Sequence, residues 1–306
     1  MAILSPSTVF GQIRDLTSTI TNLLTLLISL SFLCIVLYKI FHFNSLQRKK
    51  FFQETSILLS LNTLFILIIR SILQFIEIDL NTIKRNYLSI TEFNDSFQCR
   101  FLGYILLSIH NSLYWSFAIK SIYRFTRVIF PYRKWLHQST TYLYIFIPMD
   151  FLLGFLTTFP IFIGFNAIYL LPNEPYCTAS YMKLASLIYM PVVAFVLPLS
   201  IISICYMSII LKMRGITTIA HQQRNRRDFI VIQRIIIIIV ILSIVSLPLF
   251  IDLFVYLPKG YIDPNMNSIG WVASSIDAVI LAISLPFIDP KMHQLFKNRN
   301  IVDTQM

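Results

Sequence analysis

The chain has 306 residues, of which 56% are hydrophobic and only 13% charged, and its mean hydropathy is +0.71. Soluble domains carry about 25% charged residues, so this composition excludes most soluble enzymes. Lys and Arg total 25 against 14 Asp and Glu, but these cations are spread over short segments between apolar runs. That spread excludes a basic face for nucleic acid, which needs its cations gathered on one surface.

Seven apolar runs are long enough to cross a bilayer, which takes about 20 residues for each helix. They predict an all-α fold, a bundle of seven transmembrane helices in one domain that covers residues 1–306. No separate soluble domain and no internal repeat is visible. The spans are expected at about residues 16–41, 55–78, 100–129, 140–163, 184–212, 229–256 and 268–288.

The loop charges predict the orientation of the bundle. With the N-terminus placed outside, the inner segments hold seventeen Lys and Arg residues and the outer segments hold six. Cytoplasmic loops are normally richer in these residues. We therefore expect an extracellular N-terminus and a cytoplasmic C-terminus.

The sparse glycines and scattered histidines exclude several kinds of site. Only 7 glycines occur, and no two of them lie closer than ten residues. This spacing rules out glycine-rich phosphate loops and dinucleotide-binding motifs. The histidines and cysteines show no metal-ligand spacing, so we expect no metal and no cofactor.

Two cysteines are expected on the outer side, where the compartment is oxidising. Cys99 opens the third span, and Cys177 lies between the fourth and fifth. A bridge would hold that loop over the mouth of the bundle, although two free cysteines remain the alternative. The sequence Asn94-Asp95-Ser96 on the same side is a glycosylation signal, with Asn94 as the acceptor.

The inner end of the third span carries a recognisable motif. It reads Tyr123-Arg124-Phe125 and is followed by Pro131, seven residues after the arginine. This stretch resembles the Asp/Glu-Arg-Tyr motif of the rhodopsin-like G-protein-coupled receptors. The 25 residues from Cys99 to Arg124 are also that family's spacing between its bridging cysteine and its motif arginine.

Later helices agree with the family in register. Pro198 and Tyr206 match a proline and a tyrosine of the fifth helix, Pro248 matches the sixth-helix proline, and Pro286 matches the proline of the seventh-helix motif. Phe296 matches the phenylalanine of a short amphipathic eighth helix. The resemblance covers essentially the whole chain. It implies a multi-pass receptor of the plasma membrane, not an enzyme, with a heterotrimeric G protein and an extracellular ligand as partners.

Several positions depart from the family pattern. Tyr123 replaces the acidic residue before the arginine, and Ser246 stands where the sixth helix commonly has Trp. By register, Asn62 and Leu113 replace the second-helix aspartate and third-helix serine of the sodium site, which makes that site doubtful. Asp289 replaces the tyrosine of the seventh-helix switch.

The resemblance also implies how the inner ends of the helices would switch. We hypothesise that Arg124 pairs with Asp228 in the inactive state and that activation separates the sixth helix from the third. Arg124 and Tyr206 would then line the opening that accepts a G-protein α subunit. The alternative is that Asp228 is only a solvated loop charge.

Ionisable side chains within the spans indicate where a ligand would bind. Arg70, His110, Asp252 and Asp277 fall in the outer half of their helices. Such groups normally face the bundle interior, because exposure to lipid is unfavourable. They predict a polar ligand cavity, although Arg70 could instead pair internally with Asp277. By register, Leu106 replaces the aspartate of aminergic receptors, which leaves a peptide or another polar ligand as the preference.

A secondary transporter or proton-coupled carrier is the main alternative function. It would use Asp150, Asp252, Asp277 and Arg70 as relay or substrate groups. Such carriers usually show inverted repeats and paired broken helices. The sequence shows neither, so the receptor interpretation is favoured.

Overall fold

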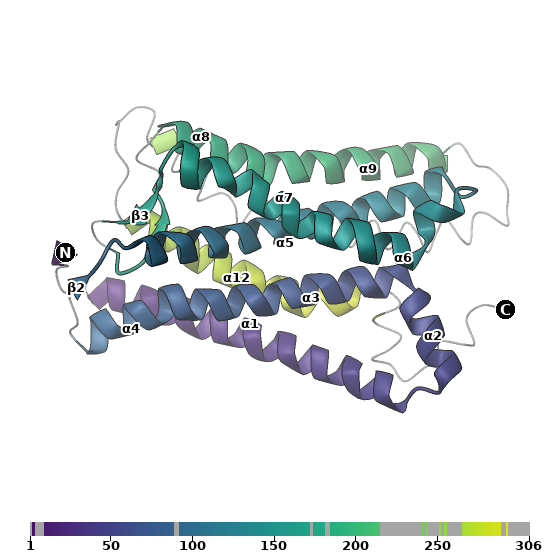
Figure 1. Ribbon diagram of the computed structural model, residues 1–306, viewed down its shortest axis with the longest axis horizontal. Helices are drawn as coiled ribbons and strands as arrows, with labels where there is room; N and C mark the ends of the chain where they lie inside the picture. Colours follow the sequence, from purple (N-terminus) through teal and green to yellow (C-terminus); the bar gives the residue numbers. More distant parts are fainter. Residues whose placement is uncertain are drawn as a thin grey trace.

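The computed structural model describes residues 2–3, 9–88, 92–171, 174–180, 184–214 and 265–288, together with 240, 243, 251, 254–255 and 292. Long helices run side by side along one axis (Figure 1). The longer elements are α1 (Val9–His42), α2 (Ser45–Gln53), α3 (Thr55–Gln74), α4 (Leu80–Tyr87), α5 (Phe97–Ile129), α7 (Ile147–Phe159), α8 (Leu184–Met190), α9 (Leu197–Arg214) and α12 (Asn265–Ile288).

Wide helical turns join several of these elements into longer helices. The turn η1 (Phe75–Asp79) connects α3 to α4, and η5 (Pro191–Val196) connects α8 to α9. Another pair of turns, η3 (Tyr142–Phe146) and η4 (Pro160–Gly164), flanks α7. Both η4 and η5 begin at a proline, whose missing N–H removes a helical hydrogen bond. The short elements α6 (Ser139–Thr141) and η2 (Lys134–His137) precede η3.

The distribution of polar and apolar side chains is that of a bundle in lipid. Large apolar residues such as Leu27, Phe65 and Ile204 are more than half exposed. Polar residues such as Thr63 and Asp150 are instead fully buried. In a bilayer the apolar surface needs no burial, whereas polar groups must find partners inside the protein. Five of the described helical segments are long and apolar enough to cross a membrane.

The centre of the bundle is formed around α5. This helix packs against α3, α7 and α9, while α1 packs against α3 and α12. The largest buried apolar cluster joins α3, α5, α9 and α12, and includes Leu67, Leu113, Trp115, Tyr206 and Leu281. Small residues allow the closest approach, which occurs where Gly154 of α7 faces Ser108 and Ser112 of α5.

The second helix differs from the sequence prediction. The span was expected at 55–78, but the helix continues through η1 and α4 to Tyr87. Residues of this extension are polar and yet buried, among them Asp79, Thr82 and Arg85. Hydropathy alone ends the helix too early, because these side chains are buried against other protein segments. The first helix likewise begins before residue 16, at Val9.

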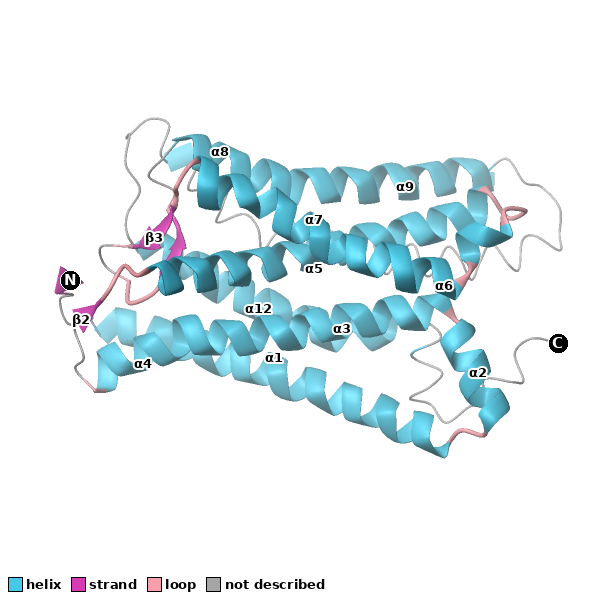
Figure 2. Cartoon of the chain, in the orientation of Figure 1, coloured by secondary structure: helices cyan, strands magenta, loops and turns pink. Residues whose placement is uncertain are grey.

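Two short antiparallel strand pairs lie at the end of the bundle where α1 begins, and α2 lies at the other end (Figure 2). Strand β1 (Ala2–Ile3) pairs with β2 (Glu92–Phe93), and β3 (Ile168–Leu170) pairs with β4 (Cys177–Ala179). The β3–β4 hairpin packs on α5. This end is the one that the charge distribution predicts to be extracellular.

Candidate ligand and coupling sites

The motif arginine Arg124 lies near the C-terminal end of α5, next to α9. Its guanidinium lies close to the hydroxyl of Tyr206, a side chain that is 4% exposed. The Nη1 atom of Arg124 is buried and has no hydrogen-bond partner in the described part of the chain. The structure thus brings together two of the residues that the sequence assigned to coupling. Nearby, Lys212 of α9 donates to the carbonyl oxygen of Ile129, at the end of α5, over 3.0 Å.

The two aromatic neighbours of Arg124 point into apolar packing. Tyr123 is 6% exposed and meets the ring of Tyr142 edge-on, with ring centroids 5.1 Å apart. Phe125 packs against the central apolar cluster. Replacement of the family's acidic residue by Tyr123 therefore leaves no carboxylate beside Arg124 at that position, and the tyrosine anchors α5 to the η3 turn instead.

Two of the three predicted kink prolines lie in the described part of the chain. Pro198 is the second residue of α9, which directly follows η5, and Pro286 lies inside α12. Both are buried. Five other predicted site residues lie outside the described part of the chain: Asp228, Ser246, Pro248, Asp252 and Phe296.

Arg70 is the centre of a polar cluster formed by α3, α5 and α12. Its side chain is fully buried in α3. The Nε atom donates to Nδ1 of His110 over 3.1 Å, and Nη2 donates to the carbonyl oxygen and the hydroxyl of Ser274, at 3.1 and 2.6 Å. Because Nδ1 of His110 accepts, this imidazole is neutral. The helices α3, α5 and α12 thereby meet at one guanidinium.

Asp277 lies within electrostatic range of Arg70 but does not pair with it. Its side chain is 2% exposed, and its Oδ1 has no hydrogen-bond partner among the residues described. Arg70 and Asp277 interact through longer-range electrostatics and do not form an ion pair. The direct Arg70–Asp277 pair, raised as an alternative from the sequence, is thus not formed. Arg70 uses His110 and Ser274 in its place.

Apolar and aromatic residues adjoin this cluster. Leu106 packs with Ile78, Tyr176 and Trp271 in one buried group. The imidazole of His110 lies 6.2 Å from the ring of Trp271, centroid to centroid. Tyr176 comes from the segment that precedes β4, so the outer loop contributes directly to the covering of the polar cluster.

Asn62 and Asp150 form a separate buried pair between α3 and α7. The amide nitrogen of Asn62 donates to Oδ2 of Asp150 over 2.8 Å. Thr63 and Ser116 place their hydroxyl oxygens 3.2 Å apart beside them, between α3 and α5. The sequence offered no partner for Asp150. Asn62 was considered only as a sodium-site position, but here its amide bonds to α7.

The disulfide between Cys99 and Cys177 is present and joins α5 to β4. The backbone N–H of Cys177 also donates to Oε1 of Glu77 over 3.3 Å, which fixes the hairpin to η1. Glu77 and the two sulfur atoms lie close enough to suggest a metal site. Since the sulfurs are bonded to each other, neither is a thiolate, and the group does not hold a metal.

The glycosylation signal occupies the turn between β2 and α5. Asn94 is exposed. Asp95 accepts two hydrogen bonds from Arg100, at 2.8 and 2.5 Å, and Ser96 caps α5 by accepting from the N–H of Cys99. The neighbours of Asn94 are thus held in place while its own side chain stays accessible.

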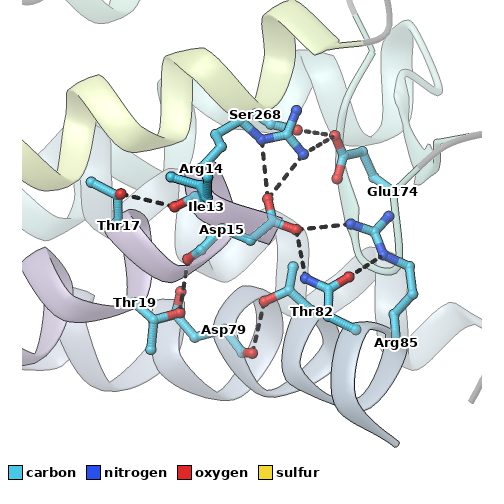
Figure 3. A network of polar contacts seen from close by, with 11 residues as sticks. Ile13, Arg14, Asp15, Thr17, Thr19, Asp79, Thr82, Arg85, Glu174 and Ser268 are labelled. Carbon is cyan, nitrogen blue, oxygen red and sulfur yellow. Dashed lines mark hydrogen bonds and ion pairs between the residues drawn. The ribbon is translucent and has the colours of Figure 1, made fainter. Parts of the chain in front are cut away.

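A network of buried charges connects four segments at the end of the bundle where α1 begins (Figure 3). Asp15 of α1 accepts from Arg14 and from Arg85 of α4, each over 2.9 Å. Arg14 lies 4.0 Å from Glu174 of the outer loop, and the hydroxyl of Ser268 in α12 also donates to Glu174. No pattern in the sequence predicts this network beyond scattered loop charges, because its members come from segments far apart in the chain.

Glu174 should make the stability of the protein depend on pH. The side chain is 2% exposed, and burial raises its pKa to about 7 from the ordinary 4.5. A raised pKa means that folding favours the protonated acid, so this contribution to stability is full below about pH 4.5 and is lost as pH rises through 7. The total loss is about 3 kcal/mol, since each pKa unit corresponds to about 1.4 kcal/mol.

Melting curves of the purified protein between about pH 5 and about pH 8 test this effect. We expect Glu174→Gln to flatten the fall in melting temperature that the wild type shows as pH rises. Asp95→Asn is the control, because Arg100 lowers the pKa of that exposed carboxyl and it stays ionised throughout the range. An unchanged slope in Glu174→Gln would show that this carboxyl does not set the pH dependence.

Comparison with known proteins agrees with this geometry. A model of the family described as 7 transmembrane receptor (rhodopsin family) matches residues 82–290, which is more than half of the chain. The matched region contains α5, α7, α9 and α12 and with them Arg124, Tyr206 and the disulfide. A search of curated proteins gives no match. The all-helical, seven-transmembrane fold class follows, and the chain belongs to the rhodopsin family of seven-transmembrane receptors.

Proposed function

We propose that this receptor sits in the plasma membrane with its N-terminus outside, binds an extracellular ligand, and activates a heterotrimeric G protein through its inner end. The observation that carries the proposal is the position of Arg124. Its guanidinium lies close to Tyr206 where α5 packs against α9, and its buried Nη1 has no partner in the described segments. An interior cation with spare donors suits a partner's backbone carbonyls or a carboxylate.

A switch needs a contact that differs between its two states. Tyr123 packs on Tyr142 and supplies no acidic group to restrain Arg124. The remaining candidate for that restraint is Asp228, which the sequence places before the sixth span. We propose that this ion pair favours the inactive state.

The polar clusters favour a receptor over a carrier. Asp150 bonds to Asn62 between α3 and α7, whereas Arg70 and Asp277 lie between α3 and α12. Asn62 and Arg70 are eight residues apart on one helix, or about 12 Å along its axis. Among the described residues these groups do not form one continuous relay, as proton or substrate transfer would require.

Basal G-protein signalling in cells tests the inner switch without a ligand. We expect Arg124→Ala to reduce it to background and Asp228→Ala to raise it, at matched surface expression. Arg127→Ala is the control, because Arg127 lies one turn later on α5 and is exposed. If Arg127→Ala reduces signalling as much as Arg124→Ala, or if Asp228→Ala leaves it unchanged, the proposed switch is wrong.

A further inference from the structure

The Arg70 cluster contains buried charged groups whose hydrogen-bonding capacity is incompletely used. Arg70 is fully buried and donates through Nε and Nη2, but its Nη1 has no partner in the part of the chain that is described. Asp277, on the facing helix α12, has a buried Oδ1 that is likewise without a partner there. Nη1 of Arg70 on α3 can therefore still donate a hydrogen bond, and Oδ1 of Asp277 on α12 can still accept one.

Leaving these atoms unpartnered is unfavourable. A buried polar group without a hydrogen bond costs about 1 to 3 kcal/mol, and more when it is charged. The two side chains influence each other electrostatically, yet they form no ion pair. A group that accepts from Arg70 and donates to Asp277 would satisfy both at once.

The charge of that group follows from the surroundings. His110 accepts from Arg70 and is neutral, so it adds no charge. Asp79 is a second buried carboxylate near Arg70; its Oδ2 accepts from Asn22 over 2.7 Å, and its Oδ1 has no partner among the described residues. An anion alone would be repelled by Asp277, and a cation alone by Arg70. A group that carries both charges avoids each repulsion.

The neighbouring side chains indicate what the rest of such a ligand would contact. His110 meets the ring of Tyr114 edge-on, at a centroid distance of 5.3 Å. Trp271 and Leu106 lie beyond His110, in the buried group that also holds Tyr176. These surfaces are apolar and aromatic, and they favour an apolar ligand side chain over a charged one.

We propose that Arg70 and Asp277 bind a free α-amino acid with an apolar or aromatic side chain. Its carboxylate accepts from Nη1 of Arg70, and its ammonium group donates to Oδ1 of Asp277. The side chain packs toward Trp271. This inference rests on the proposed receptor function, since it names the ligand class, but its test does not require signalling.

Thermal stability of the purified receptor tests the two-charge requirement. The probes are L-phenylalanine, phenylpropionate, which has only the carboxylate, and phenethylamine, which has only the amine. We expect L-phenylalanine to raise the melting temperature and the two single-charge compounds to leave it unchanged. Stabilisation by a single-charge compound equal to that by L-phenylalanine would overturn the proposal. So would the absence of any effect, which would mean that the unpartnered atoms of Arg70 and Asp277 do not bind an amino acid.

Matched variants then assign the residues. Asp277→Asn should weaken L-phenylalanine binding about a hundredfold, as expected when one partner of a buried charge contact is lost. Arg70→Gln should do the same, and Asp277→Asn carries the test if Arg70→Gln fails to fold. Asp150→Asn is the control, because it makes the same change at a fully buried carboxylate elsewhere in the bundle.

The outcomes separate this inference from the proposed function. If Asp277→Asn binds L-phenylalanine as well as the wild type does, the assignment of this site is wrong. Failure of amino acid binding together with intact basal signalling through Arg124 would reject the inference and leave the receptor function standing. Binding without signalling would support the inference and count against G-protein coupling.

Discussion

Gly154→Ala should strongly reduce the amount of receptor at the cell surface. A methyl group at this position would overlap the hydroxyl oxygen of Ser112 and would lie 2.7 Å from the carbonyl oxygen of Ser108. Because the carbonyl belongs to the backbone of α5, relief requires α5 and α7 to move apart. Overpacking of this kind costs about 3 kcal/mol. Surface labelling in cells and melting temperature in detergent measure the loss.

A matched glycine and a second substitution make this prediction specific. Gly164 has no heavy atom within 4 Å of the position where a Cβ would lie, so Gly164→Ala should fold normally. Adding Ser112→Ala to Gly154→Ala removes the hydroxyl overlap but not the approach to Ser108, and should restore stability in part. Equal behaviour of the two alanine variants would contradict a close contact of α5 with α7 at Gly154.

Cys99→Ala is the second change for which we expect a large effect. The disulfide with Cys177 closes a segment of 78 residues and fixes the outer hairpin to α5. Removing a native disulfide typically costs about 2 to 5 kcal/mol. Loss of the bridge would also release Tyr176 from the covering of the Arg70 cluster. We expect low surface expression and a lower melting temperature.

The bridge itself is tested by comparing single and double variants. Cys177→Ala and the double variant should match Cys99→Ala, because each breaks the same bond. Cys205→Ala is the control, since Cys205 is a buried free cysteine of α9. A double variant much less stable than either single variant would mean that the two cysteines act separately.

The helices could be predicted where hydropathy determines them, but not where burial of polar groups does. The apolar segment of α9 is evident from its composition. The extension of the second helix to Tyr87 was missed, because Asp79 and Arg85 are buried by contacts with α1 rather than by lipid. Such contacts depend on tertiary packing, and no local pattern encodes them.

For a similar reason, the sequence predicted some contacts of the candidate sites and missed others. The family resemblance implied that Arg124 and Tyr206 would line the same opening, and the structure places them close to each other. The partner of Arg70 depends on how α12 is rotated against α3, so the sequence could not distinguish Asp277 from Ser274. Glu174 joins the outer network only because the disulfide and the β3–β4 hairpin position its loop.

The most direct test of the coupling function is nucleotide exchange by purified G-protein heterotrimers in vesicles that contain the purified receptor. The wild type should accelerate GTP uptake by at least one heterotrimer class, and Arg124→Ala, reconstituted at the same density, should not. Addition of L-phenylalanine to the wild type shows whether the Arg70 cluster and the inner end are connected. Absence of acceleration by the wild type with every heterotrimer class would contradict the proposed coupling.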